Sequence, residues 1–172
     1  MPQNGPQSKG ALLEIEPLTA EAFAPFGDLI EVAGPPTKMI NAGMCGRHDD
    51  LARLDFDPDQ GGRAGISLFD AQARALPYAL DLVERHPLGS QAFLPLDGVP
   101  FLVCVAEDDG GTPVRFRAFL TAPGQGVNLL RNTWHGVLAP MGAPGRYAVV
   151  DRIGGGVNLE EYPLDPPIMI SG

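Results

Sequence analysis

Short apolar runs alternate with glycine and proline along nearly the whole chain, and this pattern limits the possible folds more than any other feature. The 172 residues include 22 Gly and 18 Pro, spread between the runs rather than pooled. Proline cannot donate to a backbone ladder and glycine weakens a helix, so this spacing favours short strands joined by turns. Strand-like runs lie near residues 11–18, 28–32, 38–44, 64–70, 91–96, 100–106, 114–121, 126–130, 134–139, 146–151 and 157–162.

Helical signals are few. Thr19 is a suitable N-cap for a short helix over residues 20–24, which Pro25 would end. Residues 71–85 are ambiguous, because their apolar positions have helical spacing while Pro77 sits early in the segment. The pattern therefore predicts an all-β fold, a barrel or jelly roll with one or two short helices.

The length of the chain fits one domain, which we place at residues 11–172. Residues 1–10 are polar and carry no secretory signal, so we expect a disordered extension there. No apolar stretch approaches the roughly 18 residues of a membrane span, so we expect a cytoplasmic protein. The net charge of −9 argues against nucleic-acid and membrane partners, because an acidic surface repels phosphate groups.

The chain has three histidines, His48, His86 and His135. Glu84 lies two residues before His86, so on a strand both side chains would face the same way. Gln91 follows a Pro-Leu-Gly turn and could return to the same cavity. An imidazole, a carboxylate and an amide oxygen suit a borderline or hard divalent metal. The alternative is an exposed strand end with a solvated Glu–Arg pair.

The last histidine, His135, directly follows the only tryptophan, Trp134, and opens the apolar segment 137–139. It could point into a barrel beside Trp134, with little water near it. The alternative is a core histidine that is hydrogen-bonded to a backbone carbonyl. The local pattern leaves both interpretations open.

Together these segments resemble the cupin superfamily, whose first motif has the form H-x-H-x4-E-x6-G and is followed by a second histidine-bearing motif. Glu84 stands at the first histidine position, His86 at the second, Gln91 at the glutamate and Gly98 at the glycine. His135 stands at the position of the histidine in the second motif. The resemblance implies a metal held by Glu84, His86, Gln91 and His135. Because two ligand types differ from the usual set, it also implies weaker metal binding than is usual.

A closer resemblance, to ureidoglycolate lyases of the allantoin-degrading type, covers residues from about 12 to 160. It rests on Leu18-Thr19-x-Glu21-Ala22-Phe23-x-Pro25-Phe26-Gly27-Asp28, Ile40-Asn41-x-Gly43, Arg47-His48, the run ERHPLGxQAF from Glu84, Gly126-Val127-Asn128 and Asn132-x-Trp134-His135. The resemblance implies a cytoplasmic homodimer that acts late in purine breakdown and eliminates urea from ureidoglycolate to give glyoxylate. It also implies a divalent metal, often given as nickel.

The substrate of such an enzyme carries a carboxylate, for which Arg47, Arg117 and Arg131 are candidates, because a guanidinium binds a carboxylate in a fork. Arg47 is favoured because it adjoins His48 in a family-like block. Further contacts with the substrate are expected from Asn41, Ser67, Gln91, Asn132 and Trp134.

Elimination also needs proton transfer. His86 or His135 could be the base, because the pKa of histidine naturally lies near working pH. Glu84 could orient a histidine or bind the metal. These three residues are the catalytic candidates.

Other functions remain possible from the sequence. One is a cupin of another chemistry, such as an isomerase or a dioxygenase, although a dioxygenase normally uses two or three histidines around iron, and Glu84 and Gln91 depart from that set. Another is a metabolite-binding cupin without catalysis. A third is a hydrolase that releases ammonia from the same substrate. Urea and ammonia assays distinguish them.

Overall fold

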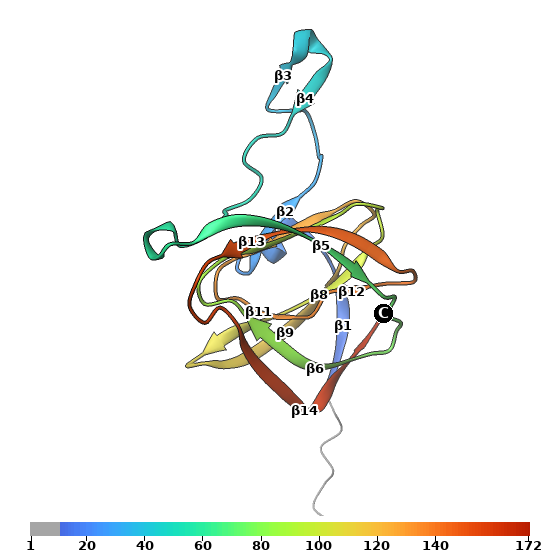
Figure 1. Ribbon diagram of the computed structural model, residues 1–172. Coiled ribbons are helices and arrows are strands. Elements are labelled where there is room, and N and C mark those ends of the chain that lie inside the picture. The colour runs from blue at the N-terminus through green and yellow to red at the C-terminus, as the bar shows by residue number, and fades with distance from the viewer. Residues whose placement is uncertain (1–10) are drawn as a thin grey trace, which may run out of the picture.

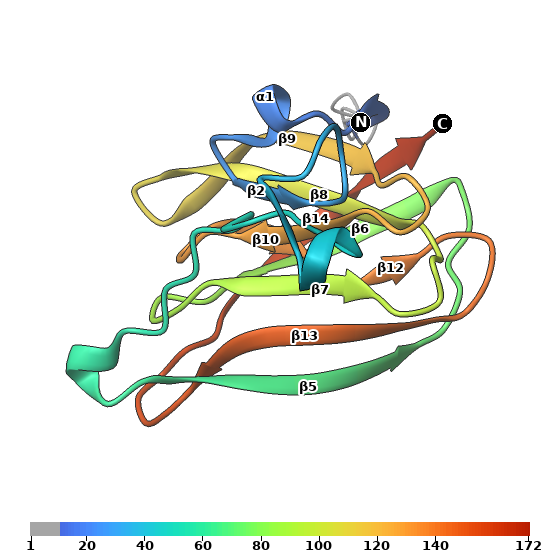
Figure 2. The same ribbon diagram turned by 90° about the horizontal axis from the view of Figure 1, so that it is seen from above.

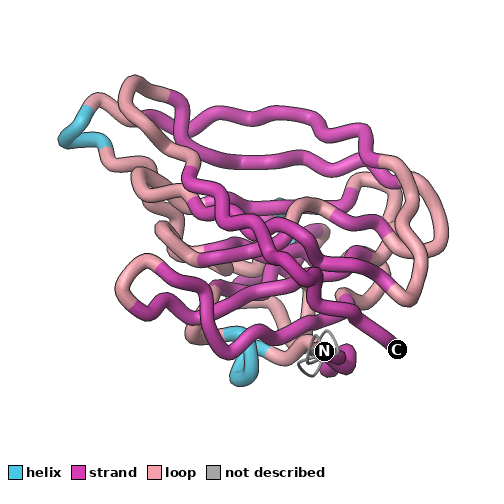
Figure 3. The backbone as a smooth tube through the Cα atoms, turned by 90° about the horizontal axis from the view of Figure 1, so that it is seen from below, coloured by secondary structure: helices cyan, strands magenta, loops and turns pink. Residues whose placement is uncertain are grey.

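The computed structural model describes residues 11–172, and strands make up nearly all of its regular structure (Figure 3). The expected extension over residues 1–10 lies outside the described residues. The helical segments are α1 (Ala20–Phe23), η1 (Asn41–Gly43) and η2 (Pro58–Gln60). The strands are β1 (Leu12–Pro17), β2 (Gly27–Ile30), β3 (Lys38–Ile40), β4 (Cys45–Arg47), β5 (Arg63–Ala71), β6 (Tyr78–Arg85), β7 (Gln91–Pro95), β8 (Phe101–Asp109), β9 (Thr112–Leu120), β10 (Gly126–Leu129), β11 (Trp134–Gly136), β12 (Ala139–Pro140), β13 (Gly145–Ile153) and β14 (Glu160–Ser171). The all-β prediction is confirmed.

The strands form two large sheets and one separate hairpin. The seven-stranded sheet has the order β11-β6-β14-β1-β9-β8-β12, and β8 pairs with β11 as well as with β9, so six of its strands close into a ring. The five-stranded sheet has the order β2-β10-β7-β13-β5. Figure 2 shows β10, β7, β13 and β5 following one another away from β8 and β9. Among residues 11–172, no helix is long and apolar enough to cross a membrane.

Strand β8 separates two apolar cores. Its residues Phe101, Val103 and Val105 belong to a cluster shared with β7, β10 and β13 of the five-stranded sheet. Its alternate residues, such as Leu102 and Cys104, belong to a second cluster built from the strands of the ring. Successive strand residues point to opposite faces, so a strand buried on both faces is apolar throughout. This explains the uninterrupted apolar run at 101–106.

Helix α1 forms as the sequence predicts. The hydroxyl of Thr19 accepts a hydrogen bond from the backbone N–H of Ala22 at 3.2 Å. This bond satisfies one of the N–H groups that the start of a helix leaves without a partner. The helix directs Phe23 into the core between the two large sheets.

Two strands differ from what the sequence predicts: the segment of β6 is ambiguous there, and β14 runs on to Ser171, well past the run expected near 157–162. The ambiguous segment 71–85 supplies strand β6, which pairs with β14 and β11 rather than forming a helix. Strand β14 contains Pro163, Pro166 and Pro167, residues that argue against a regular strand. Its register with β6 shifts between Pro163 and Ile168, so these prolines fall in an irregular stretch of the ladder.

Strands β3 and β4 form a hairpin that pairs with no other strand in the described part of the chain. It projects from the barrel as an arm, here defined as residues 37–50 (Figure 1). The strand expected near 38–44 is thus shorter than predicted, because Asn41 and Ala42 adopt positive φ and turn the chain.

The carboxylate of Asp28 holds the loop that follows the arm, at Arg53, against the barrel. It accepts hydrogen bonds from the backbone N–H and the guanidinium of Arg53, both at 2.8 Å, and from the amide of Asn128 at 3.0 Å. Partial burial alone would raise the pKa of Asp28, but the bonds from Arg53 and Asn128 outweigh it and hold this pKa below its ordinary value.

Asp28→Ala is expected to lower the free energy of unfolding by about 1–3 kcal/mol at pH 7, because it leaves the buried Asn128 amide without this acceptor. The pKa of Asp28 is lower in the folded protein than in the unfolded chain. The stability that the Asp28 carboxylate contributes is therefore fully present above its unfolded pKa, and it is lost as the pH falls through its folded pKa. Urea denaturation of both proteins from pH 7 to pH 3 measures this. A difference between them that grows on acidification would contradict the account.

Candidate active site

Glu84, His86 and His135 lie together between the two large sheets. Glu84 and His135 are direct partners in the β6–β11 ladder. One ligand atom from each of the three side chains lies within 4.8 Å of the others. The two imidazole rings have centroids 5.3 Å apart, and Glu84 Oε1 lies 4.0 Å from His86 Nε2. The expectation that Glu84 and His86 face the same way is therefore confirmed.

His135 presents an unpaired nitrogen to this cluster. Its Nδ1 lies 3.0 Å from the carbonyl oxygen of Gly136, which can only accept, so Nδ1 carries the proton and Nε2 a lone pair. Within residues 11–172, His135 Nε2 is buried without a hydrogen-bond partner. Burial is the main cause that lowers the pKa of His135 to about 4, so the ring is neutral at pH 7.

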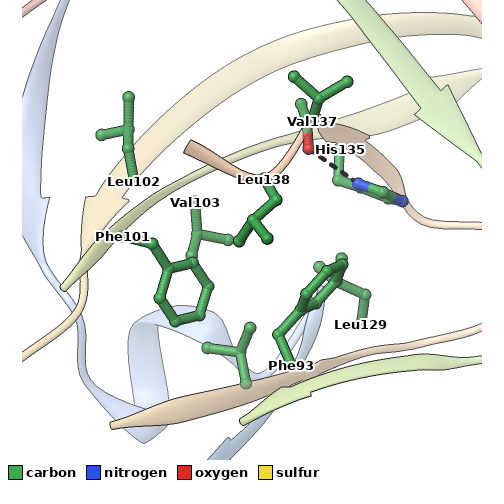
Figure 4. Close-up of a pocket in the computed structure, with 10 residues that line it drawn as sticks. Phe93, Phe101, Leu102, Val103, Leu129, His135, Val137 and Leu138 are labelled. Carbon is green, nitrogen blue, oxygen red and sulfur yellow. Dashed lines mark hydrogen bonds between the residues drawn. The ribbon is translucent and has the colours of Figure 1, made fainter. Parts of the chain in front are cut away.

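The surroundings of His135 on its other side are apolar. Figure 4 shows the ring at the edge of a small pocket lined by Phe93, Leu129, Val137 and Leu138, with a dashed line for its bond to the backbone. A buried nitrogen lone pair without a partner costs free energy. Since this pocket offers no donor, the partner has to come from the side of Glu84 and His86.

His86 and Gln91 also face each other with two acceptors. His86 Nδ1 donates to the carbonyl oxygen of Asn158 at 2.8 Å, which leaves Nε2 as an acceptor in the neutral ring. Gln91 donates from its amide nitrogen to Asp151 at 3.2 Å, which turns Oε1 toward His86 Nε2, also at 3.2 Å. Only a cation between these two atoms, either a proton or a metal ion, makes their contact favourable.

Glu84 adds a carboxylate to this set. The pKa of Glu84 is raised above its ordinary value, mainly because the side chain is partly buried. The neighbouring Glu161 also raises this pKa, and His86 lowers it by less than the two together raise it. Two imidazole nitrogens, a carboxylate and an amide oxygen form a donor set that suits a divalent metal. Glu84, His86, Gln91 and His135 therefore fit the metal that the cupin resemblance implies, with Gly136, Asn158 and Asp151 fixing the orientation of their side chains.

An open hollow of about 520 Å³ leads from solvent to this cluster. Its lining residues come from β5, β6, β7 and the connections beside them: Phe69, Asp70, Ala71, Arg74, Glu84, Gln91, Phe93, Val137 and Leu138. This volume lies in the range of small-molecule sites. Of the cluster, Glu84 and Gln91 line the hollow directly.

Trp134 lies on the opposite side of its strand from His135. It belongs to the core inside the ring, where its indole N–H donates to Asp108 at 2.8 Å and the Arg85 guanidinium stacks 4.3 Å from its ring centroid. Of the two interpretations left open for His135, a position beside Trp134 does not occur, because successive strand residues alternate between faces, and a hydrogen bond to a backbone carbonyl does.

The structure does not bring the three arginine candidates to the hollow. Arg117 forms an ion pair with Glu16 at 2.6 Å, and Arg131 pairs with Asp57 at 3.4 Å. Arg47 lies on the arm beside Asp49, away from the cluster of its own chain (Figure 1).

The polar candidates are divided. Gln91 joins the cluster, and Ser67 of β5 shares a strand face with Phe69, which lines the hollow. Asn132 lies in the turn before β11, where its backbone N–H donates to His86 O at 2.9 Å, and its side chain borders a different hollow. Asn41 lies on the arm.

Sequence reasoning missed Asp151, Asn158 and Arg74. For Asp151 the sequence offers one signal, a carboxylate at the end of the apolar run 146–151. Asn158 acts through its backbone oxygen, for which residue type gives no clue. Arg74 lies in a connection between strands whose path the sequence does not reveal.

A solved structure with some likeness is RmlC from Streptococcus suis in complex with dTDP-D-xylose. The match covers 59% of this chain and 49% of that one, with a TM-score of 0.38 and 11% sequence identity.

Sequence comparison is more specific. A family model described as ureidoglycolate lyase matches residues 11–171. A ureidoglycolate lyase from Rhodobacter capsulatus is 81% identical over 93% of this chain and 98% of the relative. Similar proteins of that name from Agrobacterium fabrum and Rhizobium meliloti are 50% and 48% identical, each over 92% of this chain and over 95% and 96% of the relatives. The chain therefore belongs to the ureidoglycolate lyase family.

Proposed function

We propose that this protein eliminates urea from ureidoglycolate and releases glyoxylate. The observation that carries the proposal is the convergence of Glu84, His86 and His135 beside an open hollow in a chain of this family. The family resemblance also supports a cytoplasmic location.

The reaction needs two proton movements. The central carbon of the substrate bears a carboxylate, a hydroxyl and a urea nitrogen. The hydroxyl loses its proton as the carbonyl forms, the carbon–nitrogen bond breaks, and the departing nitrogen gains a proton. No oxidant or additional water is consumed.

Glu84 takes the hydroxyl proton in this proposal, because its carboxylate lines the hollow and its raised pKa makes it a stronger base than an exposed glutamate. The carboxyl group then returns this proton to the departing nitrogen. His86 Nε2 lies 4.0 Å from Glu84 Oε1 and 3.2 Å from Gln91 Oε1, and keeps its lone pair for the cation proposed below. His135 stays neutral and offers its Nε2 lone pair.

We also propose a divalent metal held by Glu84, His86, Gln91 and His135, with nickel suggested by the family resemblance. When bound, such an ion polarises the hydroxyl oxygen and lowers its pKa. The unpaired Nε2 of His135 and the opposed acceptors of His86 and Gln91 support this proposal.

The products test this function. Purified protein, assayed with each enantiomer of ureidoglycolate and with or without added nickel or manganese, should release urea and glyoxylate in equal amounts. Ammonia as the main product would instead identify a hydrolase. Binding of ureidoglycolate without turnover would identify a metabolite-binding protein.

We propose further that the protein is a homodimer joined through the arm and β5. Met39 and Met44 on the arm are 56% and 85% exposed, and Ile66 and Leu68 on β5 are 76% and 72% exposed. β5 is the free edge of the five-stranded sheet. An isolated hairpin is marginally stable, and exposed apolar surface often marks an interface. A second copy of this chain is the partner that the family resemblance implies.

The double variant Ile66→Asp/Leu68→Asp is expected to elute as a monomer where wild type elutes as a dimer, because burying two carboxylates at an apolar interface is costly. Size-exclusion chromatography with light scattering measures this. Leu12→Asp, at a residue 67% exposed on β1, is the matched control and should remain dimeric. A monomeric wild type would contradict the proposal, as would a dimeric double variant.

A further inference from the structure

Among the arginines of residues 11–172, Arg74 is the one whose guanidinium forms no ion pair or hydrogen bond with the chain. Ion pairs or side-chain hydrogen bonds involve every one of the others, namely Arg47, Arg53, Arg63, Arg85, Arg115, Arg117, Arg131, Arg146 and Arg152. No acidic side chain of the described chain lies within ion-pair distance of Arg74, and its side chain donates no hydrogen bond there. The Arg74 guanidinium is therefore available to an external anion.

The backbone holds Arg74 firmly beside the candidate active site. Its N–H donates to the carbonyl oxygen of Pro140 at 2.7 Å, and its own carbonyl accepts from Gly142 at 3.3 Å. These two bonds form an isolated parallel bridge between Arg74 and Met141. From this fixed position the side chain lines the same hollow as Glu84 and Gln91.

Among residues 11–172, no other arginine or lysine lines the hollow. Asp70 and Glu84 line it, and Asp151 lies behind Gln91, so its fixed charges other than Arg74 are negative. A carboxylate that enters this hollow meets repulsion unless a cation compensates it. A guanidinium is suited to that task, because its parallel N–H groups match the two oxygens of a carboxylate.

We propose that Arg74 holds the carboxylate of the substrate, while Glu84 acts on its hydroxyl and urea nitrogen. This assignment rests on the proposed function and adds the residue that selects for an anionic substrate. The sequence alone favours Arg47, Arg117 and Arg131 for this role, but none of them lines the hollow.

The test separates the two products by charge. Glyoxylate carries the carboxylate, and urea does not. Titration of the purified enzyme should show that Arg74→Ala weakens glyoxylate binding about 10–100-fold, the range expected for a lost charge-assisted pair. Urea, used as an inhibitor of turnover, should act equally on wild type and variant. The glyoxylate affinity of Arg74→Lys should lie between those of wild type and Arg74→Ala, because lysine keeps the positive charge but lacks the two parallel N–H groups of a guanidinium.

Arg63→Ala is the matched control, because Arg63 is an exposed arginine at the other end of β5 that does not line the hollow. It should bind glyoxylate as wild type does. Arg74 is also exposed, so Arg74→Ala should melt at the wild-type temperature.

The outcomes are distinct. Active wild type with unchanged glyoxylate affinity in Arg74→Ala overturns the role of Arg74 and leaves the proposed function standing. Equal weakening of glyoxylate and urea also overturns it, because that result indicates a general disturbance of the hollow. A wild type that releases no urea overturns the proposed function and this assignment together.

Discussion

His135→Ala is expected to lower turnover by about 10²-fold or more while the protein remains folded. The substitution removes the Nε2 lone pair that faces Glu84 and His86 and has no other partner in the described chain. Loss of a group at the reacting centre typically costs this much. The same variant should bind nickel more weakly than wild type. Steady-state urea release and equilibrium dialysis with nickel measure the two effects.

The control must be equally buried, because replacing any core side chain disturbs packing. Val105→Ala meets this need, since Val105 is the ladder partner of His135 on β8 and is fully buried. It should lower the free energy of unfolding by about 1–3 kcal/mol and retain most of the turnover. If Val105→Ala loses as much activity as His135→Ala, the effect arises from packing and the assignment of His135 fails.

Glu84→Gln is expected to lower turnover by about 10²–10⁴-fold without loss of stability. Burial raises the pKa of Glu84, which shows that the folded protein disfavours its charged form. A neutral amide of the same shape avoids this cost at neutral pH. Urea release and thermal melts of the metal-free proteins test both parts.

Glu161→Gln provides the comparison for Glu84→Gln, because Glu161 is the exposed partner of Glu84 on β14. This variant should keep its turnover within a few-fold of wild type. A Glu84→Gln protein that retains full activity would remove Glu84 from the proposed chemistry. A strongly destabilised one would show instead that the carboxylate has a structural role.

Much of the fold follows from local sequence, and its exceptions have physical causes. Turn formers between apolar runs predict most strands, and Thr19 predicts the start of α1. Strand β6 escaped prediction because its pairing with β14 and β11 is non-local and overrides the helical spacing of its apolar residues. Strand β14 was expected only near 157–162, because the prolines that follow argue against a regular ladder, and a shift in register accommodates them.

The site was predictable where it depended on strand periodicity. Glu84 and His86 are two residues apart and share a face, as expected. The side of the strand on which Trp134 lies was not predictable, because it depends on how β11 sits between β6 and β8. The place of Arg74 depends on backbone bonds to the distant segment 140–142, which no local pattern encodes.

We propose that Glu84, His86, Gln91 and His135 converge on one cation. A crystal structure of the protein grown with nickel tests this most directly, through the anomalous scattering of the metal. We expect one strong peak bonded to His86 Nε2 and His135 Nε2, with Glu84 and Gln91 completing the protein ligands. A peak at another place in the chain, or none at this cluster under saturating nickel, would contradict the claim.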